Sequence, residues 1–141
     1  MGVFLYKNVR MRGGFMKETK NKKDPIAKSF GYAFEGIFTC IKKERNMKIH
    51  VTMTVLVVIA GIVLRISTTE WCLCLGLFGL VMALELVNTA VEAVVDLVTE
   101  DIHPLAKIAK DTAAGAVLIA AIMAAVIGCI IFIPKIIIFL A

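Results

Sequence analysis

Charged residues are scarce in this sequence, and three long stretches contain none. Of 141 residues, 19% are charged and 60% are hydrophobic, with a mean hydropathy of +0.88. The stretches 49–64, 71–84 and 113–133 have no charged side chain. A soluble protein of this length cannot hide so much apolar surface, because small domains bury only a modest share of it. The composition therefore favours a single domain embedded in a membrane.

The sequence also lacks the glycine-rich motifs that bind nucleotides in many soluble enzymes. Neither GxxxxGK[ST] nor GxGxxG occurs, so an ATP site here must be built from helix side chains. Residues 1–24 are basic but have no long apolar core, which excludes a secretory signal peptide. We expect a disordered basic tail there, and Met1, Met11 and Met16 all remain possible starts.

Metal-ligand spacing is absent among the four cysteines. Cys72 and Cys74 alternate within an apolar stretch, and no His or Cys partner stands near them at a metal-binding interval. Cys40 and Cys129 stand alone. All four are interpreted as small apolar residues.

Positive charge is concentrated at the N-terminus. Twelve of the sixteen Lys and Arg residues lie within the first fifty positions. Such a bias ahead of apolar spans places the N-terminus in the cytoplasm. Nucleic-acid binding is disfavoured, because no recognition module accompanies the charge.

The apolar pattern predicts an all-α membrane protein with a surface helix and three spans. Residues 25–48 form an amphipathic helix that lies on the cytoplasmic surface, with aromatic and aliphatic side chains at three- and four-residue steps. The spans are expected at about 49–64, 71–98 and 113–133. The membrane domain is thus expected at 25–141, with the N-terminus inside.

Four polar residues share one face of the second span. At 100° per residue, Glu85, Asn88, Glu92 and Asp96 fall within an arc of about 80°. Glu85 lies roughly 21 Å below Trp71, inside the inner leaflet, and Glu92 lies roughly 31 Å below it, at the interface. A carboxylate within a membrane indicates a functional site. Pairing with cations on other helices is the plainer alternative.

Further charges fall near the same depth. Glu44 continues the apolar stripe of the surface helix, where it could share a Mg²⁺ ion with Glu92 and phosphate oxygens. A frayed helix end is the alternative for Glu44. Lys110 and Asp111, just before the third span, could neutralise and orient phosphate, although such residues also anchor helices at the interface. These residues describe a phosphoryl-transfer site with metal, positive charge and a base.

Three segments resemble a known family, the small membrane-embedded diacylglycerol and undecaprenol kinases of bacteria. They are ELVNTAVEAVVD (85–96), AKDTAAGAVLI (109–119) and Gly31-Tyr32. The resemblance implies a homotrimer with active sites shared between subunits. It implies that Glu85 is the catalytic base, supported by Asn88, and that Glu44 and Glu92 bind Mg²⁺. It places the remaining contacts to ATP and its phosphates at Tyr32, Asp96, Asp101, Ile102, His103, Lys110 and Asp111.

The segment ERNMKIH (44–50) resembles the Gram-positive branch, whose members favour undecaprenol, with diacylglycerol second. Pro25 stands where Gram-negative members carry an Arg near the nucleotide. The expected function is ATP-dependent phosphorylation of a membrane lipid alcohol, which feeds lipid-carrier or phospholipid recycling. A non-catalytic membrane protein or a transporter subunit is the alternative, although a transporter predicts acids nearer the bilayer midplane.

Overall fold

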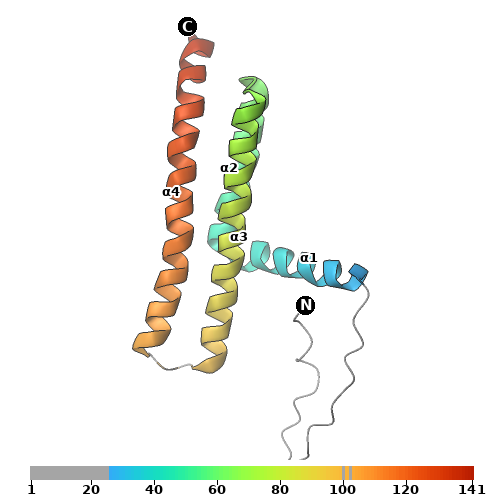
Figure 1. Ribbon diagram of the computed structural model, residues 1–141, viewed down its shortest axis with the longest axis vertical. Coiled ribbons are helices and arrows are strands. Elements are labelled where there is room, and N and C mark those ends of the chain that lie inside the picture. The colour runs from blue at the N-terminus through green and yellow to red at the C-terminus, as the bar shows by residue number, and fades with distance from the viewer. Residues whose placement is uncertain (1–25, 100, 102) are drawn as a thin grey trace, which may run out of the picture. The chain divides into compact units, whose positions relative to one another are not determined.

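The protein is helical throughout the part of the chain that the structure describes. The structure is a computed structural model, and it describes residues 26–99, 101 and 103–141. Four helices follow one another (Figure 1): α1 (Ile26–Lys43), α2 (Arg45–Val63), α3 (Thr68–Val98) and α4 (Pro104–Leu140). The described residues divide after Thr39 into two units, and the second, Cys40–Ala141, contains α2, α3 and α4. The expected all-α architecture is confirmed, and the predicted tail 1–24 lies outside the described residues.

Helix α1 has an apolar face that its own unit leaves exposed. Phe30, Phe34 and Phe38 recur every four residues, and each is more than half exposed. Lys42 and Lys43 fall in the last turn, where positive charge stabilises the negative end of the helix dipole. An amphipathic helix with these properties suits the surface of a membrane.

The break between α1 and α2 falls at Glu44, four residues before the predicted end of the surface helix. Glu44 has extended backbone angles and is the N-cap of α2, although its side chain makes no capping bond. Its amide N–H still donates to the carbonyl of Cys40, at 2.8 Å. The chain therefore turns at Glu44 without losing the hydrogen bond, and residues 45–48 belong to the first span rather than to the surface helix.

The turn between α2 and α3 is a Schellman motif. The amide of Ile66 donates to the carbonyl of Gly61 at 3.1 Å, and that of Arg65 donates to Ile62 at 3.3 Å. Arg65 occupies the left-handed region with φ of 50°, where glycine is the usual residue. Gly61 is required for a different reason. A Cβ there would lie 2.8 Å from the ring of Trp71, so only glycine admits this close approach.

Helix α3 begins with a capping box that also reaches α4. The amide of Ser67 donates to Oε2 of Glu70 at 2.6 Å, and the amide of Glu70 donates to Oγ of Ser67 at 3.3 Å. The same Oε2 of Glu70 lies 3.2 Å from Nζ of Lys135 on α4. One carboxylate thus both starts α3 and fastens it to α4 at this end of the helices.

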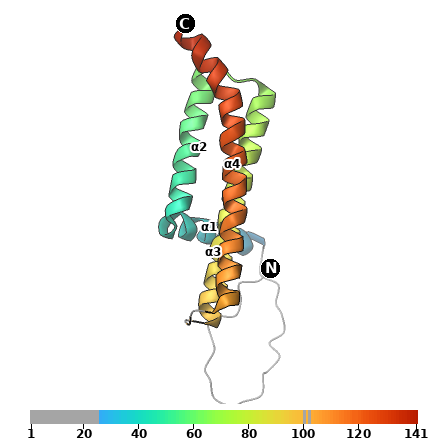
Figure 2. The ribbon, with the colours of Figure 1, turned by 90° about the vertical axis from the view of Figure 1, so that its left-hand side faces the viewer.

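Helix α3 is the central element of the second unit, because it packs along α4 and also against α2 (Figure 2). Beside the α2–α3 turn lies an apolar cluster formed by Ile66, Cys74, Ile131 and Phe132, with Trp71 packed against it. The buried polar residues of α3, Glu85 and Asn88, lie farther along the helix. The two ends of the helices thus differ in character, with one apolar cluster and one polar cluster.

Helix α4 is longer than the predicted span 113–133. It runs for 37 residues, or about 55 Å, and continues through Pro134 to Leu140. It begins at Pro104, where a proline is favoured because the first helical amide has no partner in the helix. Helix α3 runs for 31 residues and also exceeds a hydrocarbon core of about 30 Å. Both helices are therefore longer than is needed to cross a hydrocarbon core of that thickness.

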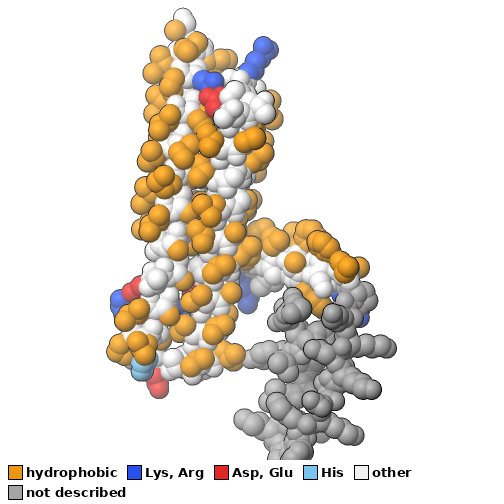
Figure 3. Space-filling view, in the orientation of Figure 1, with side chains coloured by type: hydrophobic (Ala, Val, Ile, Leu, Met, Phe, Trp, Pro, Cys, Tyr) orange, Lys and Arg blue, Asp and Glu red, His pale blue; other side chains and the backbone are white. Residues whose placement is uncertain are grey.

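Helices α2, α3 and α4 are each long and apolar enough to cross a membrane. Their outward side chains are mostly aliphatic and exposed, as Figure 3 shows for one side of α3 and α4. In that view the charged groups gather toward the ends of these helices, and hydrophobic side chains coat the length between them. The three predicted spans are confirmed as three apolar helices, with boundaries shifted by several residues.

Candidate active site

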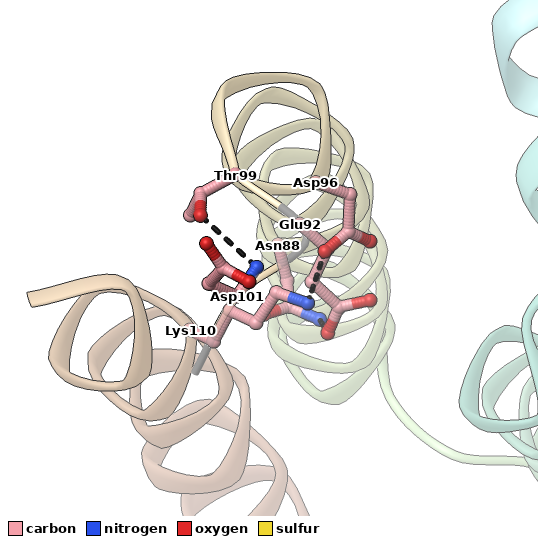
Figure 4. A network of polar contacts seen from close by, with 6 residues as sticks. All are labelled: Asn88, Glu92, Asp96, Thr99, Asp101 and Lys110. Carbon is pink, nitrogen blue, oxygen red and sulfur yellow. Dashed lines mark hydrogen bonds and ion pairs between the residues drawn. The ribbon is translucent and has the colours of Figure 1, made fainter. Parts of the chain in front are cut away.

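The polar stripe of α3 passes from buried to exposed along the helix. Glu85 is 1% exposed and Asn88 5% exposed, whereas Glu92 is half-buried and Asp96 is exposed. The side-chain amide of Asn88 donates to Oε1 of Glu92 at 3.0 Å (Figure 4). The four polar residues thus lie on one helix, as predicted, and their exposure increases toward its end. Two buried atoms, Oε2 of Glu85 and Oδ1 of Asn88, have no hydrogen-bond partner. Such orphaned buried acceptors are costly, so they suggest a site that awaits a donor.

The start of α2 brings polar groups close to Glu85. The Glu85 carboxylate interacts electrostatically with His50, with Glu44 and with Glu92, and the Asn46 side chain is within hydrogen-bonding reach of it. Glu44 and His50 are half-buried, whereas Asn46 is exposed. Within this single chain, Glu44 and Glu92 thus each lie within electrostatic range of Glu85. The Mg²⁺ site predicted for Glu44 and Glu92 stays a prediction.

Cys40 and Thr89 connect this junction to the backbone of α3. The Sγ of Cys40 lies 3.2 Å from Oγ1 of Thr89, and Oγ1 of Thr89 donates to the carbonyl oxygen of Glu85 at 3.0 Å. Cys40 is 2% exposed. Cys40 is buried, as expected of a small apolar residue, but it also makes a hydrogen bond with Thr89 that the sequence did not predict.

The two lysines at the start of α4 are both paired with aspartates. Nζ of Lys110 lies 2.5 Å from Oδ1 of Asp96 on α3, and both side chains are partly exposed (Figure 4). Nζ of Lys107 lies 2.5 Å from Oδ2 of Asp111, one helical turn away, with side-chain exposures of 74% and 61%. The predicted orienting residue Asp111 is therefore engaged by Lys107, whereas Lys110 bridges two helices.

A hollow of about 460 Å³ lies between the end of α3 and the start of α4. Its polar lining comes from both helices and from the loop between them: Asp96, Thr99, Asp101, His103, Lys107, Lys110 and Asp111. Nδ1 of His103 accepts from the amide of Leu105 at 3.2 Å and so caps α4. The amide of Asp101 donates to Oγ1 of Thr99 at 3.1 Å. The positive end of the α4 dipole and two lysines thus border a space that water can enter.

The described residues offer oxygen ligands but no closed metal cage. No three Asp, Glu, His or Cys side chains among them converge as a ready-made metal site. Mg²⁺ in nucleotide-binding sites is usually held by one or two carboxylates, with phosphates and water completing its shell. The hard carboxylate oxygens of Glu44 and Glu92, which both approach Glu85, fit that requirement.

Most of the predicted site residues belong to the second unit. Two of them, Tyr32 and Ile102, are not part of the arrangement described above. Tyr32 is half-buried in α1 and belongs to the first unit. Ile102 lies outside the described residues. The structure adds Cys40, Asn46 and Thr89, which were not predicted. Thr89 stands four positions after Glu85, the spacing at which a helical threonine bonds back to a carbonyl, so its role was detectable. Cys40 lies 49 positions from Thr89, and no local pattern indicates such a contact.

Comparison with known proteins assigns the family. A model of the family described as prokaryotic diacylglycerol kinase matches residues 31–132. The chain belongs to this family. It is 43% identical over 119 residues to undecaprenol kinase of Bacillus subtilis, which covers 84% of this chain and 97% of that protein. It is 45% identical over 107 residues to a diacylglycerol kinase of Synechocystis, covering 75% of this chain and 61% of that longer protein. A diacylglycerol kinase of Escherichia coli is 33% identical over 105 residues, covering 74% and 86%.

Membership of the prokaryotic diacylglycerol kinase family confirms the predicted class of enzyme. The chain is a helical membrane protein and a lipid kinase, so its co-substrate is ATP. The matched region contains every predicted site residue, from Tyr32 to Asp111. The alternatives of a scaffold or a transporter subunit are therefore set aside.

Proposed function

We propose that this chain phosphorylates undecaprenol with Mg-ATP at the cytoplasmic face of a bacterial inner membrane. The observation that carries the mechanism is the buried Glu85, whose Oε2 has no partner inside a span. Support for undecaprenol as the substrate comes from the relative named undecaprenol kinase, because the alignment extends over 97% of that protein. Diacylglycerol is the second candidate, on the names of the other relatives.

In this mechanism Glu85 is the general base and Asn88 supports it. The lipid hydroxyl donates to Oε2 of Glu85 while its tail stays in the bilayer. As the hydroxyl oxygen bonds to the γ-phosphorus of ATP, its proton passes to Glu85 and the bond from phosphorus to the β–γ bridging oxygen breaks, releasing ADP. The unsatisfied Oδ1 of Asn88 is available to a second donor of the bound substrates. Because transfer is nearly dissociative, positioning and charge neutralisation matter more than base strength.

The polar end of the helices binds the nucleotide. We assign Mg²⁺ to Glu44 and Glu92, whose carboxylates would hold it; when bound, the ion would neutralise phosphate charge. Lys110 supplies a cation to the phosphates and is oriented by Asp96, and Asp111 supports the site. Tyr32, Asp101, Ile102 and His103 complete the nucleotide site by family resemblance.

Orientation and assembly are part of the proposal. The N-terminus and the α3–α4 loop face the cytoplasm, because ATP is available there and because basic residues favour that side. The α2–α3 turn, with its Glu70–Lys135 pair, then faces outward. The active form is a homotrimer by family resemblance, and the exposed aliphatic faces of the three spans supply surface for contacts between subunits or with lipid.

A direct comparison of substrates tests the function. Protein purified in detergent is given Mg-ATP with undecaprenol and with diacylglycerol, matched in mole fraction, and the phosphorylated lipid is quantified. We expect a higher kcat/KM for undecaprenol. A higher value for diacylglycerol reverses the substrate assignment and leaves the kinase assignment intact. Phosphorylation of neither lipid refutes both, provided that the relative from Bacillus subtilis is active in the same detergent.

A further inference from the structure

Cys40 is linked by hydrogen bonds to the backbones of Glu44 and Glu85, two residues that the proposed mechanism uses in different roles. Through its backbone, the carbonyl of Cys40 accepts the amide of Glu44 at 2.8 Å. Through its side chain, Sγ of Cys40 contacts Oγ1 of Thr89 at 3.2 Å, and Thr89 in turn bonds to the carbonyl of Glu85. The backbones of the candidate metal ligand Glu44 and the candidate base Glu85 are therefore joined by three hydrogen bonds, which pass through Cys40 and Thr89.

The direction of these hydrogen bonds follows from the number of hydrogens. A threonine hydroxyl has one hydrogen, and that of Thr89 is directed to the carbonyl of Glu85 at 3.0 Å. Oγ1 of Thr89 is therefore the acceptor in its contact with Cys40, and the thiol S–H is the donor. The result is a directed chain from Cys40 through Thr89 to the backbone of α3 at Glu85.

The surroundings of Cys40 keep this donor in place. Burial raises the pKa of the Cys40 thiol, against the smaller opposing effect of its hydrogen bond with Thr89. At 2% exposure the side chain is also withheld from water, which would otherwise compete for Thr89.

We propose that Cys40 is a positioning residue that sets the distance between the Glu44 and Glu85 carboxylates by holding the α1–α2 junction against α3. The inference rests on the proposed function, because it assigns its effect to the carboxylates of that site. Cys40 itself touches neither lipid nor nucleotide. Its loss moves one carboxylate relative to the other, and small misplacements of reacting groups lower the rate more than they lower stability.

The test compares two substitutions at Cys40 with a matched control. Cys40→Ala removes the donor, Cys40→Ser restores one, and Cys74→Ala truncates an equally buried cysteine, 4% exposed, in the apolar cluster. We expect Cys40→Ala to lower kcat about fivefold and to raise the Mg²⁺ concentration for half-maximal activity by a similar factor. Cys40→Ser should return kcat and the half-maximal Mg²⁺ concentration to within about twofold of wild type. Cys74→Ala should leave kcat and that Mg²⁺ concentration unchanged, although it should lower the thermal unfolding midpoint at least as much as Cys40→Ala does.

Thr89 gives a second route to the same contact. Thr89→Val keeps the shape of the side chain and removes the hydroxyl, whereas Thr89→Ser retains it. The effects of Cys40→Ala and Thr89→Val on kcat should be strongly non-additive, because each breaks the same chain of hydrogen bonds. Additive effects in this double-mutant cycle overturn the proposal.

Hydrogen exchange requires no turnover, so it tests the positioning role of Cys40 independently of the proposed kinase function. In hydrogen exchange of the full-length protein in detergent, Cys40→Ala should weaken protection of the α3 amides around Thr89 and of the Glu44 amide, and Cys40→Ser should restore it. Unchanged protection in Cys40→Ala, or a Cys40→Ser variant as impaired as the alanine variant, refutes the positioning role whether or not the lipid assignment holds. If wild-type protein phosphorylates no lipid, the exchange result alone decides the role of Cys40.

Discussion

Nζ of Lys110 lies 2.5 Å from Oδ1 of Asp96, across the gap between α4 and α3 and fourteen positions away in sequence. The pair borders the hollow proposed for the nucleotide, so without phosphate the lysine is neutralised by the protein itself. We therefore expect bound ATP to replace or share this partner, since a lysine ammonium has three hydrogens to donate.

Exchanging the two charges of the Lys110–Asp96 pair distinguishes a structural role of the ion pair from a role of Lys110 in binding phosphate. Lys110→Met should lower kcat/KM for ATP about 100-fold, because one phosphate-stabilising cation is lost. The double variant Lys110→Asp with Asp96→Lys rebuilds an ion pair but should not recover activity, because position 110 then carries negative charge. Lys107→Met is the control, since its exposed pair contributes little, and it should stay within about threefold of wild type. Full recovery in the swapped variant would show that the pair is purely structural.

Replacement of the proposed base Glu85 should abolish turnover while the protein still folds and binds Mg-ATP. Glu85→Gln should lower kcat by about 10²–10⁴, while Mg-ATP binding measured by calorimetry is preserved. Glu70→Gln, which changes an acid at the other end of α3, is the matched control and should leave kcat unchanged. Retention of more than about a tenth of wild-type turnover in Glu85→Gln would assign the base elsewhere.

The two proposed metal ligands should act as a unit. Glu44→Ala and Glu92→Ala are each expected to weaken Mg-dependent ATP binding, and the double variant should lose little more than the stronger single variant. Glu35→Ala removes an exposed acid of α1 and should leave the binding constant unchanged. Additive losses for Glu44 and Glu92, measured as the Mg²⁺ dependence of ATP binding, would mean that they do not share a cation.

Gly61 should tolerate no side chain. A Cβ at this position lies 2.8 and 2.9 Å from two ring atoms of Trp71, so Gly61→Ala should lower the free energy of unfolding by about 1–3 kcal/mol. Gly76→Ala is the control, because a Cβ there meets nothing within 4 Å and alanine favours the helix by about 1 kcal/mol. Thermal unfolding in detergent compares the two. Equal midpoints would place Trp71 away from Gly61 in the membrane.

Orientation can be tested in intact cells. Single cysteines at Ser67 and at Thr99, in a background without the four native cysteines, are treated with a membrane-impermeant maleimide. We expect labelling at position 67 and protection at position 99, because the basic N-terminal segment stays inside. The reverse pattern would place the proposed site away from ATP.

Helix type and the polar stripe were predictable because both depend on local period and length. Long uncharged stretches predict spans, and 100° per residue places Glu85, Asn88 and Glu92 on one face. The boundaries were less predictable. The S-x-x-E pattern at Ser67–Glu70 is a helix start signal a few residues before the predicted start of the second span at residue 71, whereas the break at Glu44 has neither proline nor glycine to mark it. Helix α4 runs through Pro134, which was expected to mark the outer end of its span.

The sequence by itself determined the membrane setting, the number of spans and the polar face of α3, because each follows from residue type and spacing along one helix. Only the tertiary structure decided which side chains of different helices meet: Lys110 with Asp96, and Cys40 with Thr89. Side chains on different helices meet through the packing of α3 against its neighbours, which depends on turn geometry such as the left-handed Arg65 and on the close contact at Gly61. Helical periodicity describes one helix at a time. It therefore cannot decide which of several charged residues on a neighbouring helix a given side chain will contact.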